Sequence, residues 1–229
     1  MREIVMDTET TGLDPTQGHK VVEIGAVELF NHIPTGRTFH QYINPQRQMP
    51  QEAFDVHGLS IEFLMSYPVF KDIAEKFLNF IGSSTLIIHN ASFDVKFLNF
   101  ELDNVGAEKI QNDRVLDTLK LARSKYPGSP ASLDALSRRF RIDISKRNKH
   151  GALLDSQILA EVYLELIGGR QPGLELISTQ TRNTTTTSND GTFKREVPLP
   201  SLLTDTEKKA HDTFIKLLGE KCLWTKGTN

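Results

Sequence analysis

Two acidic residues, Asp7 and Glu9, stand two positions apart in IVMDTETTG, at the end of an apolar run. If that run is a strand, residues i and i+2 project from the same face, so the two carboxylates lie side by side. Repulsion and desolvation both oppose such a pair. A divalent cation relieves both, because it takes oxygen ligands from Asp and Glu. The alternative is that the strand ends at Met6 and that both acids are solvated.

A third carboxylate, Asp94, follows a β-rich run in IIHNASFDVKFLNFEL. Asp94, Leu98 and Leu102 recur at i, i+4 and i+8, which places the carboxylate on the apolar stripe of a helix. Negative charge in the first helical turn also interacts favourably with the helix dipole, and that role requires no catalysis. Both interpretations stay open for Asp94 alone.

The fourth acid, Asp155, shares a helical face with Leu159 and Leu166, so it also points toward the core. His150 lies five residues earlier, before Gly151, where a loop enters that helix. Histidine titrates near neutral pH, as a general base must, although a lone histidine is more often a capping or surface residue. Four acids on three separate elements indicate carboxylates gathered around two divalent cations, the arrangement used for phosphodiester cleavage.

The elements that must position these residues form an α/β pattern. Periodicity predicts strands at 3–8, 21–30, 38–43 and 85–89 and helices at 70–81, 93–104, 133–140 and 152–167. Three early strands followed by alternating helices and strands predict a mixed sheet with helices packed on it.

Composition restricts the class of protein. The 229 residues, 38% of them hydrophobic, fit one globular domain with an appendage. A net charge of −2 excludes a bulk-cationic nucleic-acid binder, so a polyanionic partner needs a local device such as a metal ion. The single Cys222 excludes a disulfide framework and a multi-cysteine zinc site. Without a signal-peptide core or an apolar stretch of about 20 residues, we expect a cytoplasmic protein that does not enter membranes.

The composition changes near Gly168. Residues 168–191 contain only Leu174, Leu176 and Ile177 as large apolar residues, too few to offset the entropy of ordering, so they predict a flexible linker. The following residues regain apolar side chains but number only about 35, too few for an independent core. We therefore expect a body at 1–168, a linker at 169–192 and a short helical tail at 193–229 that is held by a partner.

Three motifs, DTETTG, HNASFD and HGALLD, occur in that order and resemble the exonuclease motifs of the DEDD superfamily. The histidine five residues before the last aspartate is typical of its histidine-containing branch. Four longer phrases resemble the epsilon-type proofreading subunits of bacterial DNA polymerase III: GHKVVEIGAVEL, EAFDVHGLS, SLDALSRRF and HGALLDSQILAEVYL. The resemblance covers about residues 1–170. Cys222–Trp224 is also similar to the end of those subunits, whereas the linker does not match closely.

The resemblance implies a ribonuclease H-like fold and 3′→5′ exonuclease activity on single-stranded or frayed DNA 3′ ends, with two Mg²⁺ or Mn²⁺ ions. It implies that Asp7, Glu9 and Asp155 are metal ligands, with Asp94 assisting directly or through water. His150 would be the general base that deprotonates the attacking water.

The resemblance also implies a set of residues that contact the terminal nucleotide. Glu52 and His57, in QEAFDVHG, match positions with that role and would otherwise pass as ordinary loop residues. The substrate-binding residues implied are Asp7, Thr8, Glu9, Glu52, His57 and Asp155.

Two protein partners are implied. The tail at 193–229 would anchor the chain to the polymerase III alpha subunit. The linker segment 171–176, QPGLEL, is similar to short peptides that bind the sliding clamp, with Gln171, Leu174 and Leu176 as contacts. Two alternatives remain: an RNA-trimming exoribonuclease of the same branch, and a non-catalytic tether of polymerase and clamp. The first generally lacks such a linker and tail, and the second leaves the four acids and His150 unexplained.

Other polar residues have simpler interpretations. Asp117, in VLDTLKLA, has Leu119 where a second carboxylate would be needed, so we interpret it as a cap or structural acid. His89 ends a buried strand and is expected to be packed and hydrogen-bonded. The basic run 146–149 next to His150 is either a solvated loop or a contact to a DNA phosphate.

Overall fold

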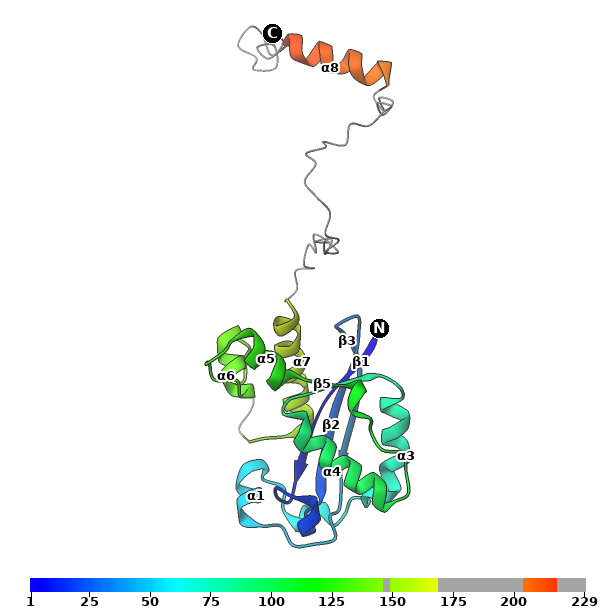
Figure 1. Cartoon of the computed structure of the whole chain (residues 1–229), viewed down its shortest axis with the longest axis vertical. Coiled ribbons are helices and arrows are strands. Elements are labelled where there is room, and N and C mark those ends of the chain that lie inside the picture. Colours follow the sequence, from blue (N-terminus) through cyan, green and yellow to red (C-terminus); the bar gives the residue numbers. More distant parts are fainter. Residues whose placement is uncertain (146–148, 169–203, 218–229) are drawn as a thin grey trace, which may run out of the picture. The chain divides into compact units, whose positions relative to one another are not determined.

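The computed structural model describes residues 1–145, 149–168 and 204–217 (Figure 1). The chain divides into two units, residues 1–176 and 177–229. Within the described residues, the first unit contains the sheet and seven α-helices, and the second contains one helix, α8 (Asp205–Leu217). The expected helical element in the tail is therefore present. Of the residues that the structure describes, none belongs to a helix long and apolar enough to cross a membrane.

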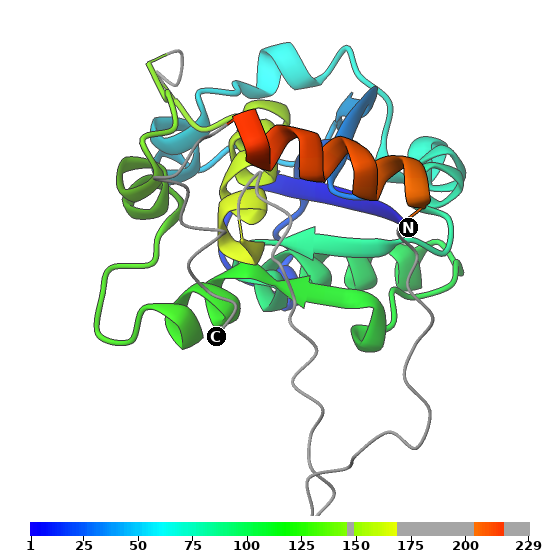
Figure 2. The same ribbon diagram turned by 90° about the horizontal axis from the view of Figure 1, so that it is seen from above.

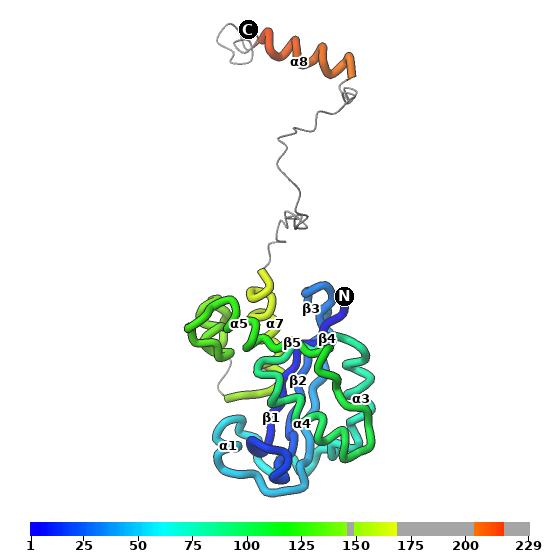
Figure 3. The backbone as a smooth tube through the Cα atoms, in the orientation of Figure 1, coloured from blue at the N-terminus to red at the C-terminus, as the bar shows by residue number. Residues whose placement is uncertain are grey.

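The first unit is built on a mixed five-stranded sheet with strand order β3-β2-β1-β4-β5. β2 is antiparallel to both β1 and β3, whereas β1, β4 and β5 are parallel. Figure 2 shows β4 and β5 running side by side, and Figure 3 follows the path of the backbone through the sheet. The strands are β1 (Arg2–Thr10), β2 (Val21–Phe30), β3 (Ile33–Tyr42), β4 (Thr85–Ile88) and β5 (Val115–Asp117).

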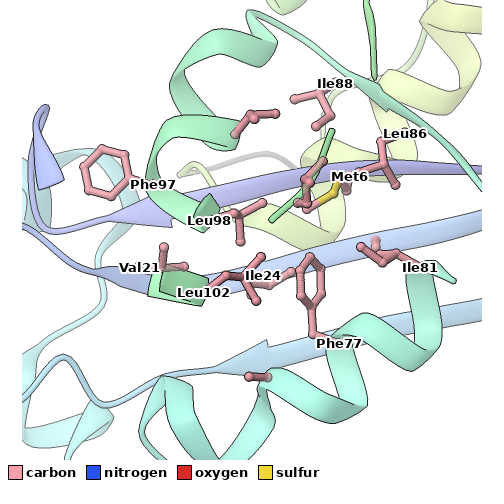
Figure 4. Close-up of a cluster of buried hydrophobic side chains, with 14 of the residues drawn as sticks. Met6, Val21, Ile24, Phe77, Ile81, Leu86, Ile88, Phe97, Leu98 and Leu102 are labelled. Atoms are coloured by element: carbon pink, nitrogen blue, oxygen red, sulfur yellow. The ribbon is translucent and has the colours of Figure 1, made fainter. Parts of the chain in front are cut away.

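Helices cover both faces of the sheet. They are α1 (Gln51–His57), α2 (Ile61–Leu64), α3 (Phe70–Ile81), α4 (Ala91–Asn104), α5 (Thr118–Lys125), α6 (Leu133–Phe140) and α7 (Ala152–Ile167). Met6 of β1 packs in one core cluster with Phe77 of α3 and Leu98 of α4 (Figure 4). Val5 packs on the opposite face with Leu159 of α7. Because successive residues of a strand alternate between faces, Asp7 and Glu9 follow Val5 toward α7, whereas Thr8 follows Met6 toward α4.

The structure corrects several sequence predictions. β1 continues to Thr10 because β2 pairs with it as far as Glu9 and Thr10, so the interpretation that the strand ends at Met6 is wrong. β3 begins at Ile33 rather than at residue 38, and α4 begins at Ala91 rather than at residue 93. The sequence also did not predict β5, a three-residue strand too short to show a period of two. The linker at 169–192, including the segment 171–176, lies outside the described residues.

Candidate active site

The end of β1 carries the first two acids. Asp7 is half-buried and Glu9 is buried, and both face α7. In the antiparallel ladder Asp7 is opposite Gly25 of β2, and Glu9 is opposite Glu23. The alternation expected from the sequence is therefore confirmed, and it places two carboxylates on one face of the central strand.

Gly25 allows α7 to approach the sheet at this position. A Cβ atom on Gly25 would lie 2.1 Å from the backbone nitrogen of Leu153 and 2.2 Å from the carbonyl carbon of Ala152, so no larger residue fits here. The hydroxyl of Ser156 donates a hydrogen bond of 2.9 Å to the Gly25 carbonyl. The first turn of α7 thus rests directly on β2 and brings Asp155 to the acids of β1.

Three side chains converge where α7 meets β1. Glu9, His150 and Asp155 each offer one ligand atom within 4.8 Å of the other two. His150 Nδ1 lies 3.1 Å from Asp155 Oδ2. Asp155 is buried, whereas the side chain of His150 is 49% exposed. The carboxylate is held by its helix, and the imidazole keeps access to solvent.

Asp94 approaches from the other face of the sheet. Its Oδ1 accepts hydrogen bonds from the backbone N–H of Thr8 at 3.1 Å and from the Thr8 hydroxyl at 2.7 Å. Burial raises the pKa of Asp94 to about 7, even though the hydrogen bonds from Thr8 act in the opposite direction. The Asp94 carboxyl is therefore costly to ionise without a nearby cation, as expected from its place on the apolar stripe of α4.

These residues line a cavity of about 730 Å³, a volume within the range of ligand-binding pockets. The four predicted acids, Thr8 and His150 form one part of its wall. The other lining residues are His89, Asn90, Phe93, Leu119, Arg123, Ser129, Pro130, Ala131, Ser132 and Leu133. These ten come from the β4–α4 junction, from α5 and from the segment that leads into α6. Five of them lie in phrases already singled out in the sequence, His89, Asn90 and Phe93 in HNASFD and Ser132 and Leu133 in SLDALSRRF. The other five belong to no motif and reach the cavity only through the fold.

Glu52 and His57 do not line this cavity. Glu52 is exposed in the first turn of α1. His57 is buried at the end of the same helix, and its Nδ1 accepts a hydrogen bond from Leu59 N at 3.0 Å. Burial lowers the pKa of His57, which favours its neutral imidazole. Their contacts to the terminal nucleotide remain predictions.

Helix α1 nevertheless contacts the segment that carries His150. The His150 N–H donates to the Val56 carbonyl at 3.3 Å, and Lys149 Nζ donates to the Phe54 carbonyl at the same distance. Lys149 is the only residue of the basic run 146–149 within the described ranges. Helix α1 thus helps to hold the backbone that carries His150.

Two other interpretations from the sequence are confirmed. Asp117 caps α5, because its side chain accepts hydrogen bonds from the backbone of Leu119 at 2.9 Å and Lys120 at 3.4 Å. His89 is hydrogen-bonded through Nδ1 to Thr118 Oγ1 at 2.9 Å, although it also lines the cavity.

The donor set fits a hard divalent cation. Carboxylate oxygens are the ligands that Mg²⁺ and Mn²⁺ prefer, and an imidazole is tolerated beside them. Burial raises the pKa of Asp94, so negative charge on this carboxyl is unfavourable without a counter-charge. A cation would supply that charge.

Known proteins are similar to this chain in sequence and in fold. The sequence pattern of the exonuclease family RNase_T matches residues 4–163. The chain is 54% identical over 191 residues to the DNA polymerase III subunit epsilon of Rickettsia felis, which covers 81% of this chain and 83% of that protein. It is 42% identical over 238 residues to the subunit of the same name from Salmonella typhimurium, which covers 97% of both.

Solved structures show the same fold. The nuclease domain of 3'hExo, a DEDDh family member bound to rAMP, aligns with a TM-score of 0.63 at 20% identity and covers 72% of this chain and 91% of that one. Exonuclease X in complex with 5′ overhanging duplex DNA aligns with a TM-score of 0.56 at 24% identity and covers 72% and 90%. The expected ribonuclease H-like fold is confirmed. The chain belongs to the exonuclease family and, within it, to the DNA polymerase III epsilon subunits.

Proposed function

We propose that the cavity at the end of β1 is where this chain removes 3′-terminal nucleotides from DNA as the proofreading exonuclease of DNA polymerase III. One observation supports this most directly: ligand atoms of Glu9, His150 and Asp155 lie within 4.8 Å of one another in a member of the epsilon family. The chain is a metal-dependent 3′–5′ exonuclease, and the residue roles that follow are our proposal.

Asp7, Glu9 and Asp155 hold the divalent cations, and Asp94 assists from the α4 side. Two Mg²⁺ or Mn²⁺ ions held there would supply activation of the attacking water and stabilisation of negative charge on the leaving 3′-oxygen. Gly25 and Ser156 maintain the contact between α7 and β2, so Asp155 keeps its distance to the acids of β1.

His150 acts as the general base. His150 Nδ1 lies 3.1 Å from Asp155 Oδ2, and because a carboxylate only accepts, we assign the proton of this hydrogen bond to Nδ1. The bond then fixes the orientation of the ring and leaves Nε2 as the proton acceptor. The exposure of the imidazole allows it to reach a water molecule beside a bound strand. The Val56 carbonyl, which accepts from the backbone of His150, holds the segment in place.

Selectivity for mismatches requires no recognition of the base. An unpaired 3′ end frays at a lower free-energy cost than a paired one, so it reaches a site for single strands more often. Thr8, Glu52 and His57 are proposed to contact that terminal nucleotide.

The decisive variant is His150→Ala. General base catalysis contributes about 10²–10⁴-fold, so the turnover of a DNA oligonucleotide should fall by that factor while Mn²⁺ binding persists. His211→Ala, at an exposed histidine of α8, is the matched control and should change neither. Near-normal turnover would contradict the assigned role, and so would a loss of cation binding that accounts for the lost activity. RNA and DNA substrates assayed in parallel test the exoribonuclease alternative.

The tail is proposed to bind the polymerase alpha subunit, and the site of action is proposed to be the cytoplasm. Helix α8 exposes Phe214 and Leu217, apolar side chains that a partner could cover. A chain truncated after Gly169 should retain nuclease activity and lose co-purification with the polymerase. Persistent co-purification would contradict the tail assignment.

Clamp binding through Gln171, Leu174 and Leu176 is also proposed, and a clamp pull-down of Leu174→Ala and Leu176→Ala tests it.

A further inference from the structure

The cavity wall formed by α5 carries a permanent positive charge. Leu119 and Arg123, four residues apart on α5, both line the cavity, because positions i and i+4 share one face of a helix. A guanidinium is protonated at every pH that a folded protein experiences. Among the described lining residues, Arg123 is the only arginine or lysine.

Arg123 differs from Arg2 and Arg37 of the same unit. Arg2 and Arg37 both form ion pairs with the buried carboxylate of Glu28. No described acidic side chain lies within ion-pair distance of Arg123, so its charge is available to a ligand. The charge of Arg123 also acts on His89, another lining residue of the cavity. Burial lowers the pKa of His89, the negative charge of Asp117 raises it, and the positive charge of Arg123 lowers it.

Two hydroxyl groups of the segment between α5 and α6 also line the cavity. Ser129 and Ser132 both line the cavity. Ser132 Oγ accepts a hydrogen bond from Ala135 N, which leaves its own O–H able to donate. One guanidinium with two hydroxyls is a donor set that suits phosphate oxygens.

The chemistry of the site requires a second place for phosphate. An exonuclease cuts between the terminal nucleotide and the strand that remains, so it must hold the substrate on both sides of the bond. The four carboxylates, with the cations that they would hold, would serve the scissile phosphate, while the same carboxylates would repel the next phosphate along the strand. A permanent positive charge on the α5 part of the cavity wall would offset that repulsion.

We propose that Arg123, with Ser129 and Ser132, binds the phosphodiester on the 5′ side of the scissile one and so holds the retained strand. The inference rests on the proposed function of the cavity. It assigns to α5 the task of keeping the remaining primer in place while its terminal nucleotide is removed.

Two substrates separate this role from chemistry at the scissile bond. One is a single-stranded DNA oligonucleotide. The other is the 4-nitrophenyl ester of thymidine 5′-monophosphate, which contains one phosphodiester and no second phosphate. In the full-length chain, Arg123→Ala should lower kcat/KM for the oligonucleotide by about tenfold, as expected for one lost charged hydrogen-bond donor. The salt dependence of that kcat/KM should weaken by about one phosphate contact. Hydrolysis of the ester should stay within about twofold of wild type, because the ester lacks the group that Arg123 contacts.

Lys125→Ala is the matched control. It removes the same charge from α5 at an exposed position two residues away, on another side of the helix, and should alter neither substrate. Equal losses on both substrates would overturn the proposal, as would an unchanged kcat/KM for the oligonucleotide. If the wild-type chain hydrolysed neither substrate, the proposed function itself would fail, and the inference with it.

Discussion

Two buried carboxylates on the α3–α4 face of the sheet differ in their electrostatics. Glu28 of β2 lies beside the start of β1, and Asp94 of α4 lies near the end of β1. Glu28 is 5% exposed and Asp94 3%. Burial raises the pKa of Glu28, but hydrogen bonds and charge from Arg2, together with Thr35 and Arg37, lower it below its ordinary value. Asp94 receives its hydrogen bonds from the neutral Thr8, and its pKa rises to about 7. The two carboxylates are about equally buried, but the negative charge of Glu28 is compensated by groups of the protein, whereas that of Asp94 requires an external cation.

Helix α7 shows the same contrast along its length. Near its C-terminal end, Tyr163 donates a hydrogen bond of 2.7 Å from its hydroxyl to the buried carboxylate of Glu3. In its first turn it presents a further carboxylate, Asp155, toward Glu9. At the structural site one donor meets one acid, whereas at the candidate catalytic site a second acid, Glu9, converges with Asp155 and its neighbour His150.

The first test removes the compensated acid. Glu28→Gln leaves Arg2 and Arg37 without their anion and should lower the free energy of unfolding by about 2–3 kcal/mol. This is less than for a fully buried pair, because the Arg2 side chain is 30% exposed. Urea unfolding measures the loss, and nuclease activity per folded molecule should be unchanged. Unaltered stability would remove the contrast between the two acids.

The second test neutralises the uncompensated acid. The pKa of Asp94 in the folded protein, about 7, lies above its value of about 3.9 in unfolded chains. The folded state therefore retains the proton longer, and this contribution to the stability of the metal-free protein is complete below about pH 4 and is lost as the pH rises to about 7. Asp94→Asn abolishes that dependence and can still accept from Thr8.

With a chelator present at pH 8, Asp94→Asn should thus be more stable than wild type by on the order of 2 kcal/mol. Toward pH 4 the difference should vanish. Thermal unfolding at both pH values measures the effect. A variant less stable than wild type at pH 8 would show that the ionised carboxylate is already well accommodated without a cation.

Local pattern was sufficient to predict the acidic part of the candidate site. The spacing of Asp7 and Glu9 on a strand, and of Asp94 and Asp155 on apolar helical stripes, predicted burial and convergence because both periodicities are properties of the chain itself. The part of the cavity wall that β5 and α5 position was not predictable in this way. β5 is too short to show a period and pairs with β4 only through the fold, and Arg123 on the following helix resembles any exposed basic residue.

Close contacts between segments far apart in the sequence were also not predictable. Nothing around Gly25 in the sequence indicates that Ala152 and Leu153 press against it, more than 120 residues later. The partner of Glu28, Arg2, is likewise distant in sequence and adjacent only across the β1–β2 ladder. Such contacts depend on tertiary packing rather than on any local preference.

Calorimetric titration with Mn²⁺ at pH 8 tests the central claim most directly, namely that the acids at the end of β1 form a cation site. Wild type should bind two ions, and Asp7→Asn and Asp155→Asn should each weaken binding by about tenfold or more, because each removes a charged oxygen ligand. Asp103→Asn, which removes an exposed carboxylate paired with Lys109, is the control and should bind like wild type. Binding that is unchanged in both Asp7→Asn and Asp155→Asn would contradict the claim.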